Sequence, residues 1–165
     1  MFLLTLLLGC GPSQKEGSEA PKATNSGGKT DTKVEMMVDA TWFADFAKAQ
    51  AEAKNGNKLI LMDFTGSDWC GWCIKLKQEV FDTKEFTDYA KNNLVLVEVD
   101  FPSKKKLSDE QKKANEDLKN KFTASRGFPT IVVTDSDGKE VWRQIGYMEG
   151  GPKAWIAKLD GVKKK

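Results

Sequence analysis

Two cysteines separated by two residues, Cys70 and Cys73, are the side chains of this sequence best suited to chemistry. A pair at this spacing can close a small disulfide ring that opens reversibly. The pair follows an apolar run at 59–64, typical of a buried strand, and precedes a stretch at 74–81 typical of a helix. Because a helix N-terminus favours an anion, we expect Cys70 to be the thiolate and Cys73, one turn further on, to be the buried resolving thiol.

Other uses of this cysteine spacing are limited by the rest of the composition. A structural zinc site needs two further ligands, yet the chain has no histidine and three cysteines in all. A c-type haem attachment needs histidine directly after the second cysteine, where Ile74 stands. The lack of histidine also excludes Cys–His and Ser–His nucleophilic sites. A pair of cysteines that only packs in a core remains as the alternative, and no cofactor or metal is indicated.

Length and charge indicate one ordinary domain. The chain has 165 residues, enough to bury a proper core. Its 26 basic and 24 acidic residues are spread along the chain and give a net charge of +2. This balance does not indicate a basic surface for nucleic-acid binding. The lysine runs at 104–106 and 163–165 are typical of a solvated loop and a basic tail. Nothing in the sequence argues against a monomer.

The N-terminal residues predict a targeting segment and a tether. Residues 1–10 end in Leu-Leu-Gly-Cys, which resembles a bacterial lipobox and would make Cys10 the lipidated start of the mature protein. The alternative is an incidental apolar N-terminus with a stray cysteine. Residues 11–34 are rich in Gly, Ser, Pro and Lys without an apolar period and predict a flexible tether. Acyl chains on Cys10 would anchor a domain at 35–162 to a bacterial membrane, facing the periplasm; a secreted soluble form is the alternative.

Apolar periodicity predicts the elements that must position the cysteine pair. Their order is a helix at 41–56 that includes Trp42 and Phe43, a strand at 58–64, the cysteine helix, a short helix capped by Asp82, a strand at 94–99, a helix at 108–124, hairpin strands at 130–134 and 140–145, and a last helix from Pro152. Strands joined by a helical crossover pair in parallel, and the hairpin adds an antiparallel edge.

A second motif, Arg-Gly-Phe-Pro-Thr at 126–130, follows the cysteine pair. Together with Trp-Cys-Gly-Trp-Cys at 69–73 and this order of elements, it resembles the thioredoxin superfamily over about residues 40–160. The resemblance implies an α/β thioredoxin fold, a central mixed sheet of about four to five strands flanked by helices. It also implies a cis Pro129 that opens a central strand against the disulfide, with an ordinary trans proline as the alternative.

Within the superfamily, Gly-Ser-Asp-Trp-Cys-x-Trp-Cys at 66–73 is similar to secreted bacterial thioredoxin-like proteins and to the C-terminal periplasmic domain of thiol:disulfide interchange proteins. The resemblance implies a thiol–disulfide oxidoreductase for protein disulfides, served by a redox donor or acceptor protein. Trp72 replaces a histidine that favours the thiolate in oxidising relatives, so we expect the reductase direction. The alternatives are an oxidase or isomerase, or a non-catalytic binding module.

The resemblance also carries roles for residues outside the pair. Asp63 would exchange the Cys73 proton, which requires a pKa raised by burial; an aspartate that ends a strand is the alternative. Trp69 would shield the pair or simply pack in the core. The backbone of Phe128 would pair with an extended substrate chain. Gly146 would lie on the rim of that groove, or be an ordinary loop glycine.

Overall fold

A five-stranded mixed sheet forms the centre of the computed structural model, which describes residues 40–122, 124 and 127–164. The predicted lipobox and tether lie outside the described residues. The elements are β1 (Trp42–Phe43), α1 (Phe46–Gly56), β2 (Leu59–Thr65), α2 (Gly71–Leu76), a π-helical continuation η1 (Lys77–Phe81), α3 (Lys84–Asn93), β3 (Leu94–Asp100), α4 (Asp109–Lys121), β4 (Thr130–Thr134), β5 (Glu140–Ile145) and α5 (Gly151–Lys163). The predicted fold class is confirmed.

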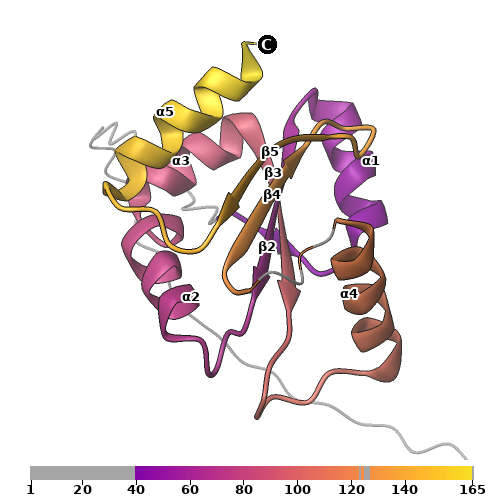
Figure 1. The fold of residues 1–165 in the computed structure, drawn as a ribbon. Coiled ribbons are helices and arrows are strands. Elements are labelled where there is room, and N and C mark those ends of the chain that lie inside the picture. The colour runs from indigo at the N-terminus through magenta and orange to yellow at the C-terminus, as the bar shows by residue number, and fades with distance from the viewer. Residues whose placement is uncertain (1–39, 123, 125–126, 165) are drawn as a thin grey trace, which may run out of the picture. The chain divides into compact units, whose positions relative to one another are not determined.

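Strand β2 lies in the middle of the sheet, whose order is β1-β3-β2-β4-β5. It pairs in parallel with β3, where Asp63 is opposite Glu98, and in antiparallel with β4, where Asp63 is opposite Ile131. Strands β4 and β5 form the predicted antiparallel hairpin. Helices α2, α3 and α5 cover one face of the sheet, and α1 and α4 cover the other (Figure 1).

Successive side chains of β2 enter different hydrophobic cores, because neighbouring residues of a strand point to opposite faces. Leu61 packs with Leu76 of α2 and Trp155 of α5, whereas Met62 packs with Ala49 of α1. The same alternation places Asp63 on the Leu61 face. The carboxyl group of Asp63 therefore lies on the face covered by the helix that carries the cysteines.

The prediction of a helix from about residue 41 is wrong at its beginning. Trp42 and Phe43 instead form the short edge strand β1, which pairs in parallel with β3. Helix α1 begins after Asp45, whose carboxylate accepts two N–H hydrogen bonds of the first turn at 2.9 and 3.2 Å. The Trp42 ring packs on Phe81, with 5.5 Å between centroids. Pairing with β3 and this aromatic contact outweigh the helical spacing.

The predicted cap of the short helix is also displaced by one residue. Helix α3 begins after Thr83, whose Oγ1 accepts a 3.3 Å hydrogen bond from the N–H of Phe86. Asp82 forms an ion pair with Lys77 instead. Thr83 has the extended backbone of an N-cap, whereas Asp82 still belongs to the helical end of η1. The predicted helix at 108–124 begins as expected and ends at Lys121.

Candidate active site

The turn between β2 and α2 brings the cysteine pair to the carboxyl end of the central strand. The N–H of Cys70 donates to the Gly66 carbonyl at 2.9 Å, which closes the turn. Cys70 is the N-cap of α2, and its Sγ accepts a 3.3 Å hydrogen bond from the Cys73 N–H. The two sulfurs form a disulfide whose Cα atoms are 5.2 Å apart. Cys70 is 7% exposed and Cys73 2%, so Cys70 is the more accessible sulfur.

Phe128, Pro129 and Gly146 come together at the beginning of β4. The Phe128–Pro129 peptide bond is cis. The Gly146 N–H donates to the Pro129 carbonyl at 2.8 Å, so the chain after β5 stays beside the proline. Gly146 has φ +76°, a left-handed conformation that favours glycine.

Trp69 lies between the cysteine turn and the segment after β3. Its side chain is 51% exposed, and its Nε1 donates to the Phe101 carbonyl at 2.8 Å. The ring meets Phe128 edge-on, with centroids 5.8 Å apart, and Phe128 stacks on Phe101 at 5.4 Å. Trp69 is thus half-exposed and ordered by its contacts rather than part of either core.

Trp72 lies on the other side of the pair and is 59% exposed. Its ring packs on Tyr147, with 5.6 Å between centroids, and Lys75 Nζ lies 5.3 Å from the Trp72 ring and 4.7 Å from the Tyr147 ring. The Tyr147 hydroxyl donates to the Glu79 carboxylate of η1. Side chains of α2 and of the segment after β5 therefore hold Trp72 in place.

Residues predicted on either side of the substrate groove line a shallow hollow of about 310 Å³. Trp72, Phe128 and Gly146 line it, together with Tyr147 and Glu149. Tyr147 and Glu149 were not among the predicted site residues. An aromatic residue directly after the rim glycine was the available signal, but only the tertiary structure places its ring against Trp72.

Asp63 is buried on the sheet face beneath α2. Its pKa is raised from 3.8 to about 8, mainly by burial and also by the charges of Glu98 and Asp100, against an opposing effect of Lys77. Among the described residues, its Oδ1 has no hydrogen-bond partner. The pKa of Glu98, on the neighbouring strand, is also raised, first by burial and then by Asp100. The electrostatic setting matches the one expected for a proton-exchanging carboxyl group.

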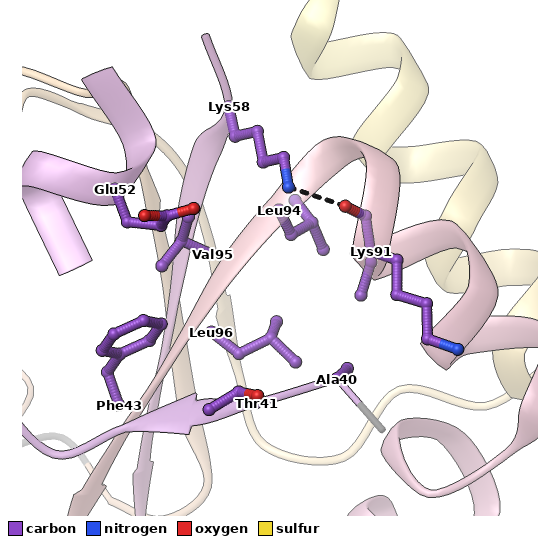
Figure 2. A pocket seen from close by; sticks show the side chains of 10 residues that line it. Ala40, Thr41, Phe43, Glu52, Lys58, Lys91, Leu94, Val95 and Leu96 are labelled. Carbon is purple, nitrogen blue, oxygen red and sulfur yellow. Dashed lines mark hydrogen bonds between the residues drawn. The ribbon is translucent and has the colours of Figure 1, made fainter. Parts of the chain in front are cut away.

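A larger hollow, of about 410 Å³, lies away from the disulfide at the β1 edge of the sheet. Lys58 and Leu94, at the amino ends of β2 and β3, line it, and the Lys58 ammonium reaches across its rim to the Lys91 carbonyl at 2.6 Å (Figure 2). In open α/β sheets ligands bind at the carboxyl ends of strands, the end at which Cys70 lies. None of the predicted site residues lines this hollow.

Two further observations concern metals and membranes. In residues 40–122, 124 and 127–164, no cluster of three or more His, Cys, Asp or Glu side chains could hold a metal ion. Within the same residues, no helix combines the length and apolar character needed to cross a bilayer. The predicted lipidation residue, Cys10, lies outside the described part of the chain.

Comparison with known proteins agrees with this geometry. The model of the thioredoxin-like domain family matches residues 46–163. The disulfide bond reductase DsbH of Chlamydia pneumoniae is 39% identical over 119 residues, which cover 72% of this chain and 70% of the relative. A solved structure of DsbH oxidoreductase superposes with a TM-score of 0.72 at 34% identity, covering 85% of this chain and 95% of that one.

A more distant structure shares the fold alone. The oxidised C-terminal domain of Neisseria meningitidis DsbD matches with a TM-score of 0.53 at 18% identity, over 74% of this chain and 99% of that domain. The family match covers the sheet, the cysteine pair and the proline segment. The chain therefore belongs to the thioredoxin-like family.

Proposed function

We propose that this thiol–disulfide oxidoreductase reduces disulfides of polypeptides, with Cys70 as the attacking sulfur and Cys73 as the resolving one. The observation that carries the proposal is the Cys70–Cys73 disulfide at the start of α2. A sulfur at that position, once reduced, faces unpaired N–H groups that favour its thiolate. The reductase name of the Chlamydia relative supports the direction.

The reaction consists of two thiol–disulfide exchanges. The Cys70 thiolate attacks one sulfur of the substrate disulfide, forms a mixed disulfide, and releases the other substrate sulfur as a thiolate that takes up a proton. Cys73 then loses its proton and attacks Cys70 Sγ, which releases the second substrate sulfur and closes the Cys70–Cys73 disulfide. Two electrons pass from the protein to the substrate, and a dithiol donor protein must return them.

Asp63 is the proposed proton acceptor in the second exchange. It lies on the sheet face that α2 covers, and its pKa of about 8 keeps a useful fraction of both protonation states near neutral pH. A buried carboxyl without a partner on Oδ1 is unfavourable for stability, which is expected where the group serves a reaction instead.

A trapping experiment tests the assignment of the two cysteines. Cys73→Ser, reduced and mixed with a disulfide-bridged peptide, should accumulate a mixed disulfide at Cys70 that mass spectrometry detects. Cys70→Ser is the matched control and should form no such adduct at a comparable rate. Adduct formation by Cys70→Ser at a rate comparable to that of Cys73→Ser, or by neither variant, would overturn the proposed roles.

We further propose that the protein works in the bacterial cell envelope, anchored through lipid on Cys10. Disulfide exchange is common outside the cytosol, and the Leu-Leu-Gly-Cys segment at 7–10 has the form of a lipobox. Labelling cells that express the full chain with a radioactive fatty acid should label the protein, and Cys10→Ser should abolish the label. Equal labelling of both forms would refute the anchor.

A further inference from the structure

The segment after β3 carries three consecutive exposed lysines, Lys104, Lys105 and Lys106, and one carboxylate organises it. Asp68 accepts hydrogen bonds from three successive backbone N–H groups, those of Ser103 at 2.8 Å, Lys104 at 2.7 Å and Lys105 at 2.9 Å. These bonds lower the pKa of Asp68, so the carboxylate stays ionised. Asp68 precedes Cys70 by two residues, which places the lysine segment at the edge of the active site.

Two more contacts join the same stretches of chain. Asp100 accepts from the Ser67 N–H at 3.0 Å and from the Ser67 hydroxyl at 2.7 Å. Trp69 Nε1 donates to the Phe101 carbonyl. Each residue from 67 to 69 is therefore bonded to the segment that begins at Asp100. These hydrogen bonds fix the position of the lysine segment relative to the disulfide.

The lysine charges are turned to solvent with little local neutralisation. Among the described residues, no carboxylate lies within ion-pairing distance of the Lys104 or Lys106 ammonium, and Lys105 Nζ is 4.0 Å from the buried Asp100. Asp68 and Asp100 offset part of the charge, but both carboxylates face hydrogen-bond donors of the protein. In the first turn of α4, Asp109 pairs with Lys112 at 2.9 Å, and the Glu110 carboxylate hydrogen-bonds with Ser108.

We propose that Lys104, Lys105 and Lys106 form a docking site for an acidic segment of the polypeptide that exchanges disulfides with Cys70. Like charges held side by side repel, and an anionic partner relieves that repulsion while steering the encounter. A polypeptide suits the place better than an anionic membrane, because a bilayer against this loop would block access to the adjoining disulfide. The inference rests on the proposed reduction of polypeptide disulfides.

Single-turnover kinetics test the proposal. The reduced full chain is mixed with two disulfide-bridged peptides of equal length, whose cysteines are flanked by Asp and Glu in one and by Asn and Gln in the other. Tryptophan fluorescence follows formation of the Cys70–Cys73 disulfide. At low ionic strength, the acidic peptide should react about tenfold faster, and the advantage should fall below about twofold at 0.5 M salt.

Charge reversal tests whether Lys104 and Lys106 cause the faster reaction of the acidic peptide. K104E/K106E should remove the advantage of the acidic peptide and leave the rate with the neutral peptide within about twofold. The matched control, K139E/K158E, makes the same change in net charge at two other exposed lysines. Lys139 adjoins the β4–β5 turn, at the end of the sheet opposite the disulfide. The control variant should retain the advantage.

The outcomes separate the docking proposal from the proposed function. No reaction with either peptide would overturn the function itself. Reaction of both peptides at equal rates, or equal losses in the two variants, would overturn the docking site alone. Binding of the full chain to anionic phospholipid vesicles that K104E/K106E abolishes, with equal rates for the two peptides, would assign the lysines to a membrane instead.

Discussion

Replacing Asp63 by asparagine should make the oxidised protein more stable and its redox cycle slower. The side chain is buried, and its pKa rises from 3.8 to about 8 when the chain folds. The folded protein therefore holds the proton more tightly than the unfolded chain does. The contribution of Asp63 to the wild-type free energy of unfolding therefore falls as the pH rises from 3.8 toward about 8, and it falls no further above that value.

The size of the effect follows from the same two pKa values. At pH 7 the unfolded chain has Asp63 ionised, whereas the folded protein keeps it largely protonated, and this difference corresponds to about 4 kcal/mol of lost stability. Asparagine has a similar shape and no charge, and it still buries an amide without full hydrogen bonding. We therefore expect Asp63→Asn to gain roughly 2–4 kcal/mol at pH 7 and almost nothing near pH 4.

Urea unfolding of the oxidised proteins between pH 4 and 9 measures this difference. Asp117→Asn is the matched control, because the Asp117 side chain is 64% exposed and should change stability by less than about 0.5 kcal/mol at any pH. Parallel pH dependence in wild type and Asp63→Asn would refute the raised pKa. A variant less stable than wild type at pH 8 would refute the whole argument about burial.

The same variant tests the role of Asp63 in the reaction. Since the ionised form accepts the Cys73 proton, the wild-type rate of mixed-disulfide resolution should rise about tenfold between pH 7 and 9, following ionisation at about 8. Asp63→Asn should resolve the mixed disulfide at least about tenfold more slowly at pH 8. Stopped-flow fluorescence of the reduced protein with a peptide disulfide measures both. An unchanged rate would remove Asp63 from the mechanism.

Three further substitutions probe the surroundings of the site. Gly66→Ala should displace the Trp69 ring, because an added methyl would lie 2.6 Å from its Nε1; we expect altered tryptophan fluorescence and a loss of about 1–3 kcal/mol in urea unfolding. Asn115→Ala should cost about 1–3 kcal/mol, since it removes a buried 2.7 Å hydrogen bond to the Asp100 carbonyl; a loss below about 0.5 kcal/mol would contradict this. Tyr147→Phe removes the hydroxyl that donates to Glu79, so Tyr89 should be the one tyrosine left to titrate in ultraviolet absorbance, with stability unchanged within about 0.5 kcal/mol.

Short-range sequence patterns were sufficient to predict the central strands, the cap of α4, the hairpin turn and the disulfide. The apolar runs of β2 and β3 are continuous because both faces of these strands are buried. Ser108 caps α4 as expected, with the Gln111 N–H at 3.2 Å from its Oγ. The hairpin turn closes at Gly138, which has φ +84°. The spacing of Cys70 and Cys73 between a strand and a helix pointed directly to their disulfide.

The remaining features depend on contacts between segments far apart in the chain. Trp42 has helical spacing with the residues of α1, but pairing with β3 decides its conformation. Tyr147 enters the site because Gly146 bonds to Pro129 and turns the chain toward α2. Asp68 belongs to the motif at 66–73, but the sequence does not reveal its hydrogen bonds, because its three N–H partners lie 35 to 37 residues further on.

The reduction potential of the Cys70–Cys73 disulfide tests the proposed reductase direction most directly. Equilibration with dithiothreitol or glutathione, followed by tryptophan fluorescence, measures it because Trp69 and Trp72 flank the pair. Without a histidine at position 72, one contribution that favours the reduced thiolate in oxidising relatives is missing, so we expect a potential near the value of about −270 mV that thioredoxin has. A potential near about −120 mV, that of a strong oxidant, would contradict the account.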